Sequence, residues 1–523
     1  MRKRFREVFR TFSIKLLMSA GSAPLVTPRR KNALHAATAS RTARYRRPVR
    51  LSRSRVPRLC AIGAVFAVVA ATSCSRPAPA PREPAPATGI AAASPAPTAP
   101  PTQVTQPVTP TGDFSAVTRL VDDAVAARRL PGAVVQIGHA GKIVFRAAFG
   151  ARKLDGEPGL DGSPSPAEPM TEDTLFDLAS LTKSIATTTA VLQLYEQGKI
   201  RLDEPVQTYL PDFNPTGDPR RARVTLRMLL THTSGIAGDL SLDGPWGLTA
   251  ADKAEGVKRA LAAWVVFEPG AMFHYSDIGF IILGTLVEKI TGQSLDGYVR
   301  EHVFAPLGMS DTYYLPAANA CGPHEIRGNA LVSDPDGPRT TDCPADSWST
   351  GLLTRVAPTA LDEDTPGINP HFGLPLRGTV HDPTARRMGG VAGSAGVFTT
   401  VHDLGLFAQA LLDRRANRPS TFPLQQATVE LMTTPQQPGA GPDLRGLGWD
   451  IDTPHSRPRG TVFPVGSFGH TGFTGVSMWM DPGSDTYVIV LANVIHQRGG
   501  PPIATLSGDV ATEAARALHL YGT

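Results

Sequence analysis

The chain has 523 residues, of which 41% are hydrophobic and 19% are charged, and its formal net charge is +6. This is ordinary globular composition at a length that suits one large or two medium domains. The charge is uneven, because residues 1–58 hold 17 Lys or Arg and one acid, a net +16 that leaves −10 for the other 465 residues. The basic excess belongs to an N-terminal leader, so nucleic-acid binding by the rest of the chain is not expected.

An export signal is predicted near the N-terminus. Residues 59–73 form an apolar run of signal-peptide length behind the basic leader, and the run ends just before Cys74. The end of the run resembles a lipobox, in which the cysteine is lipidated and becomes the first mature residue, although Ala71 stands where that motif usually has Leu. Plain signal cleavage and an uncleaved anchor are the alternatives, and the long leader indicates a start codon downstream of Met1.

A tether is predicted to follow the signal. Residues 75–112 are rich in Pro, Ala and Thr and hold almost no large apolar side chains, so they cannot bury a core. The predicted organisation is a leader and signal over residues 1–74, a disordered or polyproline-like tether over 75–112 and a globular domain over 113–523. We expect an exported protein, periplasmic or on the cell surface, that is held at a membrane as a lipoprotein.

The globular domain is predicted to open with a helix over residues 114–129, where apolar residues recur at helical spacing. Two short β-rich runs, 133–137 and 143–148, flank a turn and predict a hairpin. A Gly- and Pro-rich loop is expected over 155–170. The apolar stretch 175–197 then predicts a buried helix with Ser and Lys near its start.

The C-terminal end of the domain is also rich in predicted strands. Residues 475–480 and 487–493 flank a turn and predict a second hairpin, and residues 506–520 predict a terminal helix. Strands at both ends with helices between them favour an α+β domain. In this arrangement both chain ends form one antiparallel sheet flanked by helices, with a mostly helical subdomain inserted.

Two cysteines lie inside the globular domain. Cys321 and Cys343 fall in a segment rich in Pro, Asp and Gly, and in an exported protein this pair predicts a disulfide that closes a surface loop. Neither has a CxxC or His partner at metal spacing, so we expect no zinc site. The sequence shows no other metal or nucleotide signature, and no cofactor is expected. We expect the surrounding segment, residues 315–388, to contribute to the rim of the substrate cleft.

Ser180 and Lys183 are the candidate nucleophile and its partner. A spacing of three residues places both side chains on one face of the predicted helix. Serine is a poor nucleophile unless another group takes its proton, and an amine at this spacing can take it or relay it. Ser-x-x-Lys is also the nucleophile motif of serine β-lactamases and penicillin-binding proteins. Alone the motif is weak, because a serine at a helix start and a solvated lysine recur by chance.

Three further segments make the motif specific. They are LLTHTSGI at residues 229–236, Tyr275-Ser276-Asp277, and His470-Thr471-Gly472. With them, nearly all of residues 113–523 resemble the class C β-lactamase and penicillin-binding-protein-like serine hydrolases. Residues 378–400 are similar to a subgroup related to penicillin-binding protein 4B. The resemblance implies a β-lactamase/transpeptidase-like fold.

The resemblance also implies catalytic roles. Ser180 is the acylated nucleophile, and Lys183 either accepts its proton or holds a neighbouring base ionised. Tyr275 matches the family tyrosine that shuttles the proton, and which of the two is the general base stays open. An oxyanion hole is implied from the backbone N–H groups of Ser180 and Phe473.

His470 and Thr471 are expected to line a strand edge and to meet a carboxylate or carbonyl group of the substrate. The family motif usually opens with Lys, and a histidine is largely neutral at pH 7, so His470 disfavours a dedicated β-lactamase. The second motif usually ends in Asn, whereas Asp277 accepts hydrogen bonds only and can pair with Lys183. Such pairing strengthens the case for Tyr275 as the base.

The leading prediction is a cell-envelope serine hydrolase that forms an acyl-enzyme on Ser180. In descending order, the expected substrates are a D-alanyl or related peptide derived from peptidoglycan, a small ester and a β-lactam. An α/β-hydrolase would need a Gly-x-Ser-x-Gly elbow, which the sequence lacks. A non-catalytic penicillin-binding-like sensor or scaffold is the alternative from another class. We interpret His232 as a structural residue of its loop and Trp449 as a core residue.

Overall fold

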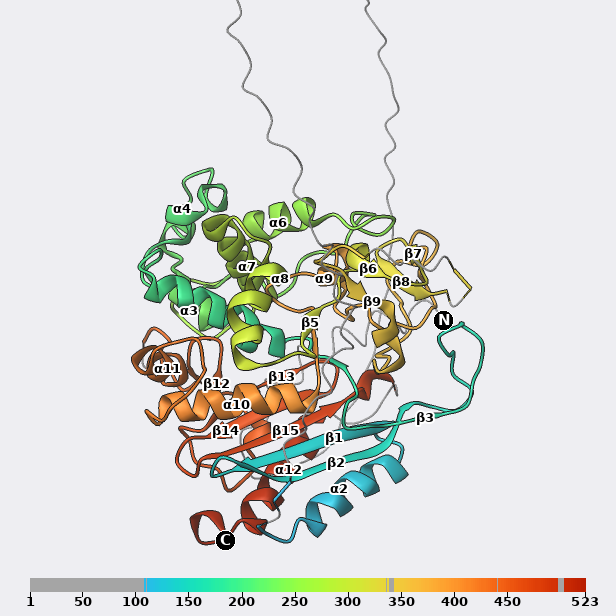
Figure 1. Cartoon of the computed structure of the whole chain (residues 1–523). Helices are drawn as coiled ribbons and strands as arrows, with labels where there is room; N and C mark the ends of the chain where they lie inside the picture. Colours follow the sequence, from blue (N-terminus) through green and yellow to red (C-terminus); the bar gives the residue numbers. More distant parts are fainter. Residues whose placement is uncertain (1–107, 110, 335, 338–342, 440, 497–502) are drawn as a thin grey trace, which may run out of the picture. The chain divides into compact units, whose positions relative to one another are not determined.

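The computed structural model (Figure 1) describes the following residues: 108–109, 111–334, 336–337, 343–439, 441–496 and 503–523. The predicted leader, the lipidation candidate Cys74 and most of the predicted tether lie outside the described residues. Export and membrane anchoring therefore stay predictions from the sequence.

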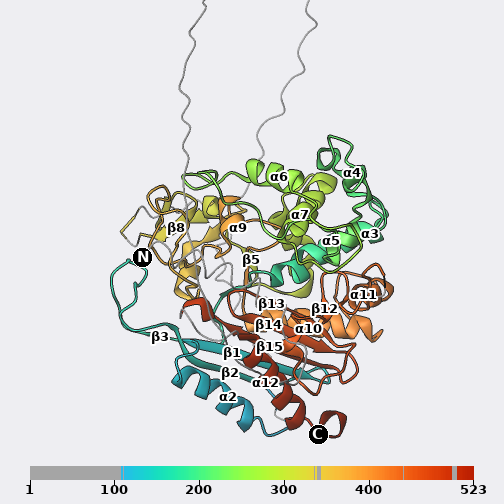
Figure 2. The ribbon, with the colours of Figure 1, turned by 180° about the vertical axis from the view of Figure 1, so that it is seen from behind.

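One eight-stranded antiparallel sheet joins the two ends of the domain (Figures 1 and 2). Its strands are β1 Gly132–His139, β2 Lys142–Lys153, β3 Glu168–Pro169, β11 Leu444–Arg445, β12 Asp450–Asp452, β13 Phe468–Gly472, β14 Val476–Asp481 and β15 Thr486–Ala492. The strand order is β11-β12-β13-β14-β15-β1-β2-β3, so β1 from the N-terminal end lies between β15 and β2. This order confirms the predicted α+β architecture with a sheet built from both ends.

Most of the helices lie between the two strand-rich ends. Among them α7 is buried along most of its length, and it ends at Gly292, whose φ of +73° suits glycine. The α-helices are α2 Ser115–Ala126, α3 Thr189–Glu196, α4 Val206–Tyr209, α5 Leu226–Leu230, α6 Lys253–Ala262, α7 Asp277–Thr291, α8 Leu295–Val299, α9 Pro383–Arg387, α10 Val401–Arg415, α11 Gln426–Thr433 and α12 Ile503–Ala517.

Short elements complete the described part of the chain. The strands outside the large sheet are β4 Phe176–Asp177, β5 Tyr313–Tyr314, β6 Ala320–Cys321, β7 His324–Arg327, β8 Ala330–Ser333, β9 Trp348–Ser349 and β10 Val397–Thr399. The 3₁₀ and π helices are η1 Lys183–Thr188, η2 Pro211–Phe213, η3 Arg221–Arg223, η4 Arg300–Phe304, η5 Ala305–Leu307, η6 Ala317–Asn319, η7 Thr350–Thr354, η8 Arg457–Arg459, η9 Val494–His496 and η10 Leu520–Gly522.

Helices cover both faces of the large sheet because its strands send alternate apolar side chains to opposite sides. On β1, Val135 and Ile137 pack in the core that includes α2 and α12, while Val134 belongs to the opposite core. Helix α10 lies on that opposite side, as Figures 1 and 2 show. The predicted helices 114–129 and 506–520 correspond to α2 and α12.

The start of the predicted helix 175–197 is wrong. The helix begins at Leu181 and continues through η1 and α3, whereas β4 pairs with β10 instead of joining the helix. A short apolar run suits a buried strand as well as a helix, so periodicity alone does not separate the two. Pairing with a strand more than 200 residues away in the chain decides the outcome here. Ser180 therefore lies in the turn just before the helix.

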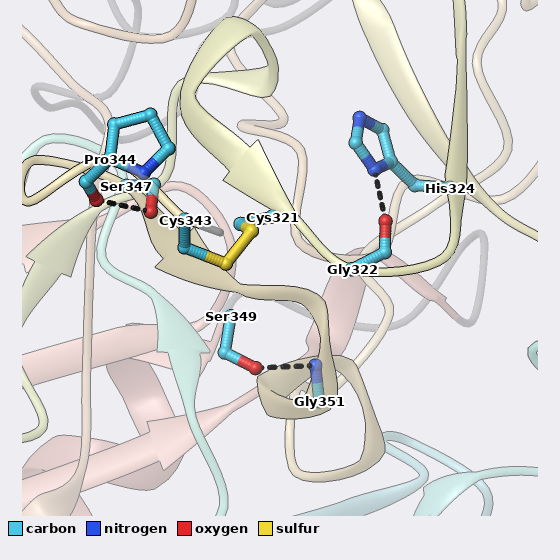
Figure 3. The surroundings of a disulfide bond; sticks show 8 residues. All are labelled: Cys321, Gly322, His324, Cys343, Pro344, Ser347, Ser349 and Gly351. Atoms are coloured by element: carbon cyan, nitrogen blue, oxygen red, sulfur yellow. Dashed lines mark hydrogen bonds between the residues drawn. A yellow bond between two sulfur atoms is a disulfide. The ribbon is translucent and has the colours of Figure 1, made fainter. Parts of the chain in front are cut away.

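The segment 315–388 holds small pairs of strands and the short helix α9. Cys321, at the end of β6, forms a disulfide with Cys343 (Figure 3). Strand β6 pairs in parallel with β9, which follows Cys343 in the chain, and Ser349 of β9 accepts the N–H of Gly351 at 3.2 Å. The disulfide thus closes a loop whose two ends are already neighbours through strand pairing.

Within the described ranges, no single helix has both the length and the apolar composition needed to span a membrane. The bent pair Asp277–Thr291 and Leu295–Leu307, with 79° between its two parts, meets those two criteria only when both parts are taken together.

Candidate active site

Ser180 lies in the turn between β4 and the helix that starts at Leu181, and it is partly exposed. Lys183 follows within one helical turn and is fully buried. Its Nζ donates hydrogen bonds to Ser180 Oγ at 2.9 Å and to the carbonyl oxygen of Ser394 at 2.8 Å. The predicted nucleophile and the predicted amine are therefore in direct contact.

The turn that carries Ser180 is held by the buried carboxylate of Asp177. One carboxylate oxygen accepts the N–H of Ala179 at 2.8 Å, and the other accepts the N–H of His381 at 2.7 Å. Burial raises the pKa of Asp177 to about 6, although both hydrogen bonds favour the charged form. Ala179 has a φ of +43°, a left-handed conformation that costs a non-glycine residue about 1–2 kcal/mol. Strain of this kind beside a reactive side chain is typical of functional turns.

The end of β13 packs against the same turn. A Cβ atom on Gly472 would lie 2.2 Å from the carbonyl oxygen of Leu178, so the strand can approach this closely only because the residue is glycine. The approach brings the next residue, Phe473, beside the turn that carries Ser180. The Phe473 ring is 71% exposed and stacks on His381 with 5.7 Å between ring centroids.

Tyr275 enters the site from the loop before α7. Its ring centroid lies 5.3 Å from Lys183 Nζ, and Lys183 and Ser180 both act to lower the pKa of its hydroxyl. The next residue, Ser276, caps α7 by accepting the N–H of Gly279 at 3.1 Å, so the start of this helix fixes the position of the tyrosine. Burial raises the pKa of Tyr275 by more than the charge of Lys183 lowers it.

Asp277, in the first turn of α7, forms an ion pair with Lys183. Burial by itself would lower the pKa of Lys183, but the negative charge of Asp277, together with Tyr275, raises it above its ordinary value. Lys183 is therefore an ammonium group at neutral pH. In that state it donates a hydrogen bond to Ser180 but cannot take a proton from it.

Two further carboxylates, Asp239 and Asp382, face Asp277. Asp239 is open to solvent on one side, yet desolvation of its carboxyl group and the charge of Asp277 raise its pKa to about 7. Burial and the same charge also raise the pKa of Asp382, which caps α9 by accepting the N–H of Ala385 at 2.7 Å. The sequence predictions assigned a role to neither residue: Asp382 lies within the similar segment 378–400 and Asp239 just after residues 229–236, but nothing in the sequence indicates that they meet at Asp277.

A buried ion-pair network supports the wall that carries Asp382. Arg386 pairs with Asp362 at 2.9 Å, and its guanidinium also donates to the carbonyl oxygen of His381 at 2.7 Å. His381 in turn donates its N–H to Asp177, as described above. The predicted rim segment 315–388 thus connects directly to the turn of the nucleophile.

His470 lies on β13 with its ring centroid 6.2 Å from that of Tyr275, and Thr471 follows it on the same strand, beyond the one residue pair that joins β12 to β13. His470 Nδ1 is 2.7 Å from the carbonyl oxygen of Thr471, a contact that requires the proton on Nδ1. Burial and the nearby Arg445 hold the pKa of His470 well below its ordinary value. His470 is therefore neutral, and this motif supplies no cation to the site.

The structure can be compared with the sequence interpretation at Trp449 and His232, and it adds His455 to the site. Trp449 is fully buried in the core, in line with its interpretation. His232 is also buried, and its ring stacks on that of Tyr275. His455, from the loop after β12, lies 5.5 Å from the Tyr275 ring and was missed, because nothing in its local sequence marks it. Among the described residues, no group of three or more His, Cys, Asp or Glu is arranged to hold a metal ion.

The sequence has clear relatives. A family model described as Beta-lactamase matches residues 117–508. The chain is 30% identical to a protein of Escherichia coli K12 named "Putative D-alanyl-D-alanine carboxypeptidase", over 69% of this chain and 78% of that protein. It is 29% identical to the N-acetylmuramyl-L-alanine amidase of Bacillus subtilis, over 73% of this chain and 80% of that protein.

Solved structures share the fold. Simvastatin synthase from Aspergillus terreus matches with a TM-score of 0.56 and 22% identity, over 79% of this chain and all (100%) of that one. A class C beta-lactamase from Rhodobacter sphaeroides matches with a TM-score of 0.52 and 21% identity, over 76% of this chain and 99% of that one. With the family match over most of the globular domain, these findings agree with the geometry of Ser180 and Lys183: the chain belongs to the beta-lactamase family and is a serine hydrolase of the class C and penicillin-binding-protein-like kind.

Proposed function

We propose that Ser180 is the nucleophile of a cell-envelope hydrolase that cleaves a D-alanyl peptide bond, or a related amide or ester bond, through an acyl-enzyme. One observation carries the proposal: Lys183 Nζ lies 2.9 Å from Ser180 Oγ while Asp277 keeps it charged. The names of the two curated relatives both refer to amide bonds of alanine. A small ester is the second substrate class in this proposal.

The charge of Lys183 assigns the proton transfer to Tyr275. As a phenolate stabilised by Lys183, Tyr275 takes the proton of Ser180 while Ser180 Oγ attacks the carbonyl carbon of the substrate. Tyr275 then gives this proton to the leaving amine or alcohol as the substrate bond breaks. In deacylation Tyr275 takes a proton from the attacking water and returns it to Ser180. The backbone N–H groups of Ser180 and Phe473 stabilise the oxyanion in both steps.

The charges around the site bear on the kind of substrate. Asp239, Asp277 and Asp382 gather negative charge beside Lys183, which lowers the pKa of Asp239 and Asp382, as Arg386 does for Asp382. The neutral His470 adds no positive charge. A substrate with a carboxylate next to the scissile bond is therefore disfavoured relative to a neutral one. A β-lactam and a peptide that ends in a free D-alanine both carry such a carboxylate. Within the proposed substrates, these charges therefore favour a D-alanyl bond without a free carboxylate beside it, or a neutral amide or ester, over either of them.

A sensor or scaffold without catalysis is disfavoured by the same geometry. Such a protein has no need to hold a buried ammonium group against a serine hydroxyl, because burying that charge costs free energy. Lys183 contacts Ser180, Ser394 and Asp277, so the chain keeps the full set of partners that a buried ammonium group beside the serine needs.

We also infer that the chain is exported and anchored through its N-terminus. The apolar run before Cys74 supports this inference, as does the disulfide of Cys321 with Cys343, since disulfides persist mainly in oxidising compartments. Mass spectrometry of the membrane-bound protein should find a lipid-modified N-terminal Cys74. An unmodified N-terminus at another residue would exclude the lipoprotein assignment.

Covalent labelling tests the nucleophile. A fluorophosphonate should form one adduct, which mass spectrometry locates on Ser180, and Ser180→Ala should abolish it. The matched control is Ser184→Ala, on the helix that follows Ser180, where the hydroxyl donates to the carbonyl oxygen of Gly448 at 2.7 Å and is not available for reaction. The control should retain full labelling. Labelling of folded Ser180→Ala at the same rate as the wild type would refute the proposal.

The pH dependence tests the assignment of the base. Asp277 raises the pKa of both Lys183 and Tyr275, so Asp277→Asn should lower both. The wild-type rate of ester hydrolysis should rise with pH toward the high pKa of Tyr275. In Asp277→Asn this rise should move to lower pH, because the charge that raises the pKa of Tyr275 is gone. In Tyr275→Phe it should disappear, and an unchanged pH–rate profile in both variants would contradict the assignment.

Substrate charge tests the role of Asp239. The pKa of this group is about 7, so it is neutral at lower pH and negative above it. Between pH 6 and pH 8 the KM for an anionic cephalosporin should increase, while the KM for a neutral ester stays level. At pH 8 the increase in this KM should be roughly two- to fivefold, as expected for one partly screened charge. Asp239→Asn should abolish it. An equal change for both substrates would show that Asp239 does not act through charge.

A further inference from the structure

His232 belongs to the most recognisable loop of the sequence but has no role in the mechanism above. It follows α5 with a φ of +56° and is only 1% exposed. A histidine in a left-handed conformation is uncommon, and its burial also removes both ring nitrogens from water. From the sequence alone it is a structural residue of the loop.

His232 contacts the ring of Tyr275 and the backbone of both residues next to it. The two rings are stacked, with 4.2 Å between centroids and 26° between planes. His232 Nδ1 accepts the N–H of Ser276 at 3.1 Å, and the carbonyl oxygen of His232 accepts the N–H of His274 at 2.7 Å. One residue thus holds the backbone before Tyr275, the backbone after it and the face of its ring.

Other rings near Tyr275 make weaker contacts. His455 and His470 lie 5.5 and 6.2 Å away, and both are tilted by more than 40°. Among the described residues, His232 is therefore the ring that stacks on the phenol. Burial, with the charges of Arg445 and Lys183, holds the pKa of His232 well below its ordinary value, so its ring is neutral and does not serve as a base at pH 7.

We propose that His232 is a positioning residue for catalysis, whose stacked ring blocks one face of the Tyr275 phenol and keeps its hydroxyl beside Ser180 and Lys183. The inference rests on the proposed function, because it concerns proton transfer by Tyr275. The hydroxyl oxygen lies on the axis of the terminal torsion, so only a swing of the ring about the Cα–Cβ bond would carry it away, and the stacked ring of His232 stands in the path of such a swing on one side. Small misplacement of a reacting group reduces the rate by roughly 100-fold, so a stacked neighbour at this position has a direct effect on catalysis.

Two variants separate the ring face of His232 from its hydrogen bond. His232→Asn tolerates the left-handed backbone and keeps an oxygen acceptor for the Ser276 N–H, but it loses the ring. It should fold with nearly the wild-type melting temperature, while kcat falls roughly 10- to 100-fold and KM changes little. His232→Phe keeps the ring and loses the acceptor. It should melt at a lower temperature but retain kcat within about threefold while it is folded.

A double-mutant cycle with Tyr275→Phe completes the test, because it asks whether His232 acts through the phenol hydroxyl. In the Tyr275→Phe background, His232→Asn should reduce the remaining rate by less than about twofold. The matched control is His302→Asn. His302 also lies against a tyrosine, at 4.5 Å from the Tyr298 ring, but on η4 outside the site, so its loss should leave kcat unchanged in both backgrounds.

The outcomes are distinguishable. The positioning role would be overturned if His232→Asn and Tyr275→Phe had fully additive effects on the free energy of activation. It would also be overturned if the activity of both His232 variants simply followed their melting temperatures. Neither result would affect the assignment of the nucleophile. A wild-type rate in Tyr275→Phe would instead overturn the proposed base, and the positioning role with it. Labelling of Ser180 by the fluorophosphonate reports on the nucleophile independently of either result.

Discussion

A buried ammonium group is the constraint on which the site depends. Lys183 is fully buried, and leaving its charge without partners would cost several kcal/mol. Its partners come from three separate parts of the chain: the hydroxyl of Ser180, the carbonyl of Ser394 and the carboxylate of Asp277. The turn after β4, the loop before β10 and the start of α7 must all converge for this charge to remain buried. The nucleophile is thereby positioned by the same contacts that satisfy the lysine.

The same charge explains why two departures from the family motifs fit together. Asp277 in place of an amide keeps Lys183 protonated, which gives the role of base to Tyr275 in our proposal. His470 in place of a lysine is neutral, because burial and Arg445 disfavour a second positive charge beside the first. Together they leave positive charge at the base of the site and negative charge from Asp239 and Asp382 around it. This distribution favours substrates that lack a carboxylate at the scissile bond.

Local patterns were sufficient for most of the fold. The two hairpins and the terminal helices were predicted because alternating or helical apolar spacing over a few residues already separates strand from helix. The prediction failed at residues 175–180, where the apolar run suits both. Pairing of β4 with β10 and the hydrogen bonds of Asp177 make this stretch a strand and a turn. Such partners are distant in sequence, so no local pattern could reveal them.

The sequence by itself pointed to the residues that carry the chemistry in our proposal: the spacing of Ser180 and Lys183 and the motif that holds Tyr275 are local features that can be read without a structure. It did not determine how protons are distributed among them. That distribution depends on the burial of Lys183 and Tyr275 and on the charge of Asp277 beside them, which arise only when separate parts of the chain meet in the fold. A pKa responds to every charge and to the loss of water within several ångströms, whatever the distance along the sequence. The tertiary structure therefore decided the protonation states, and with them the assignment of the base.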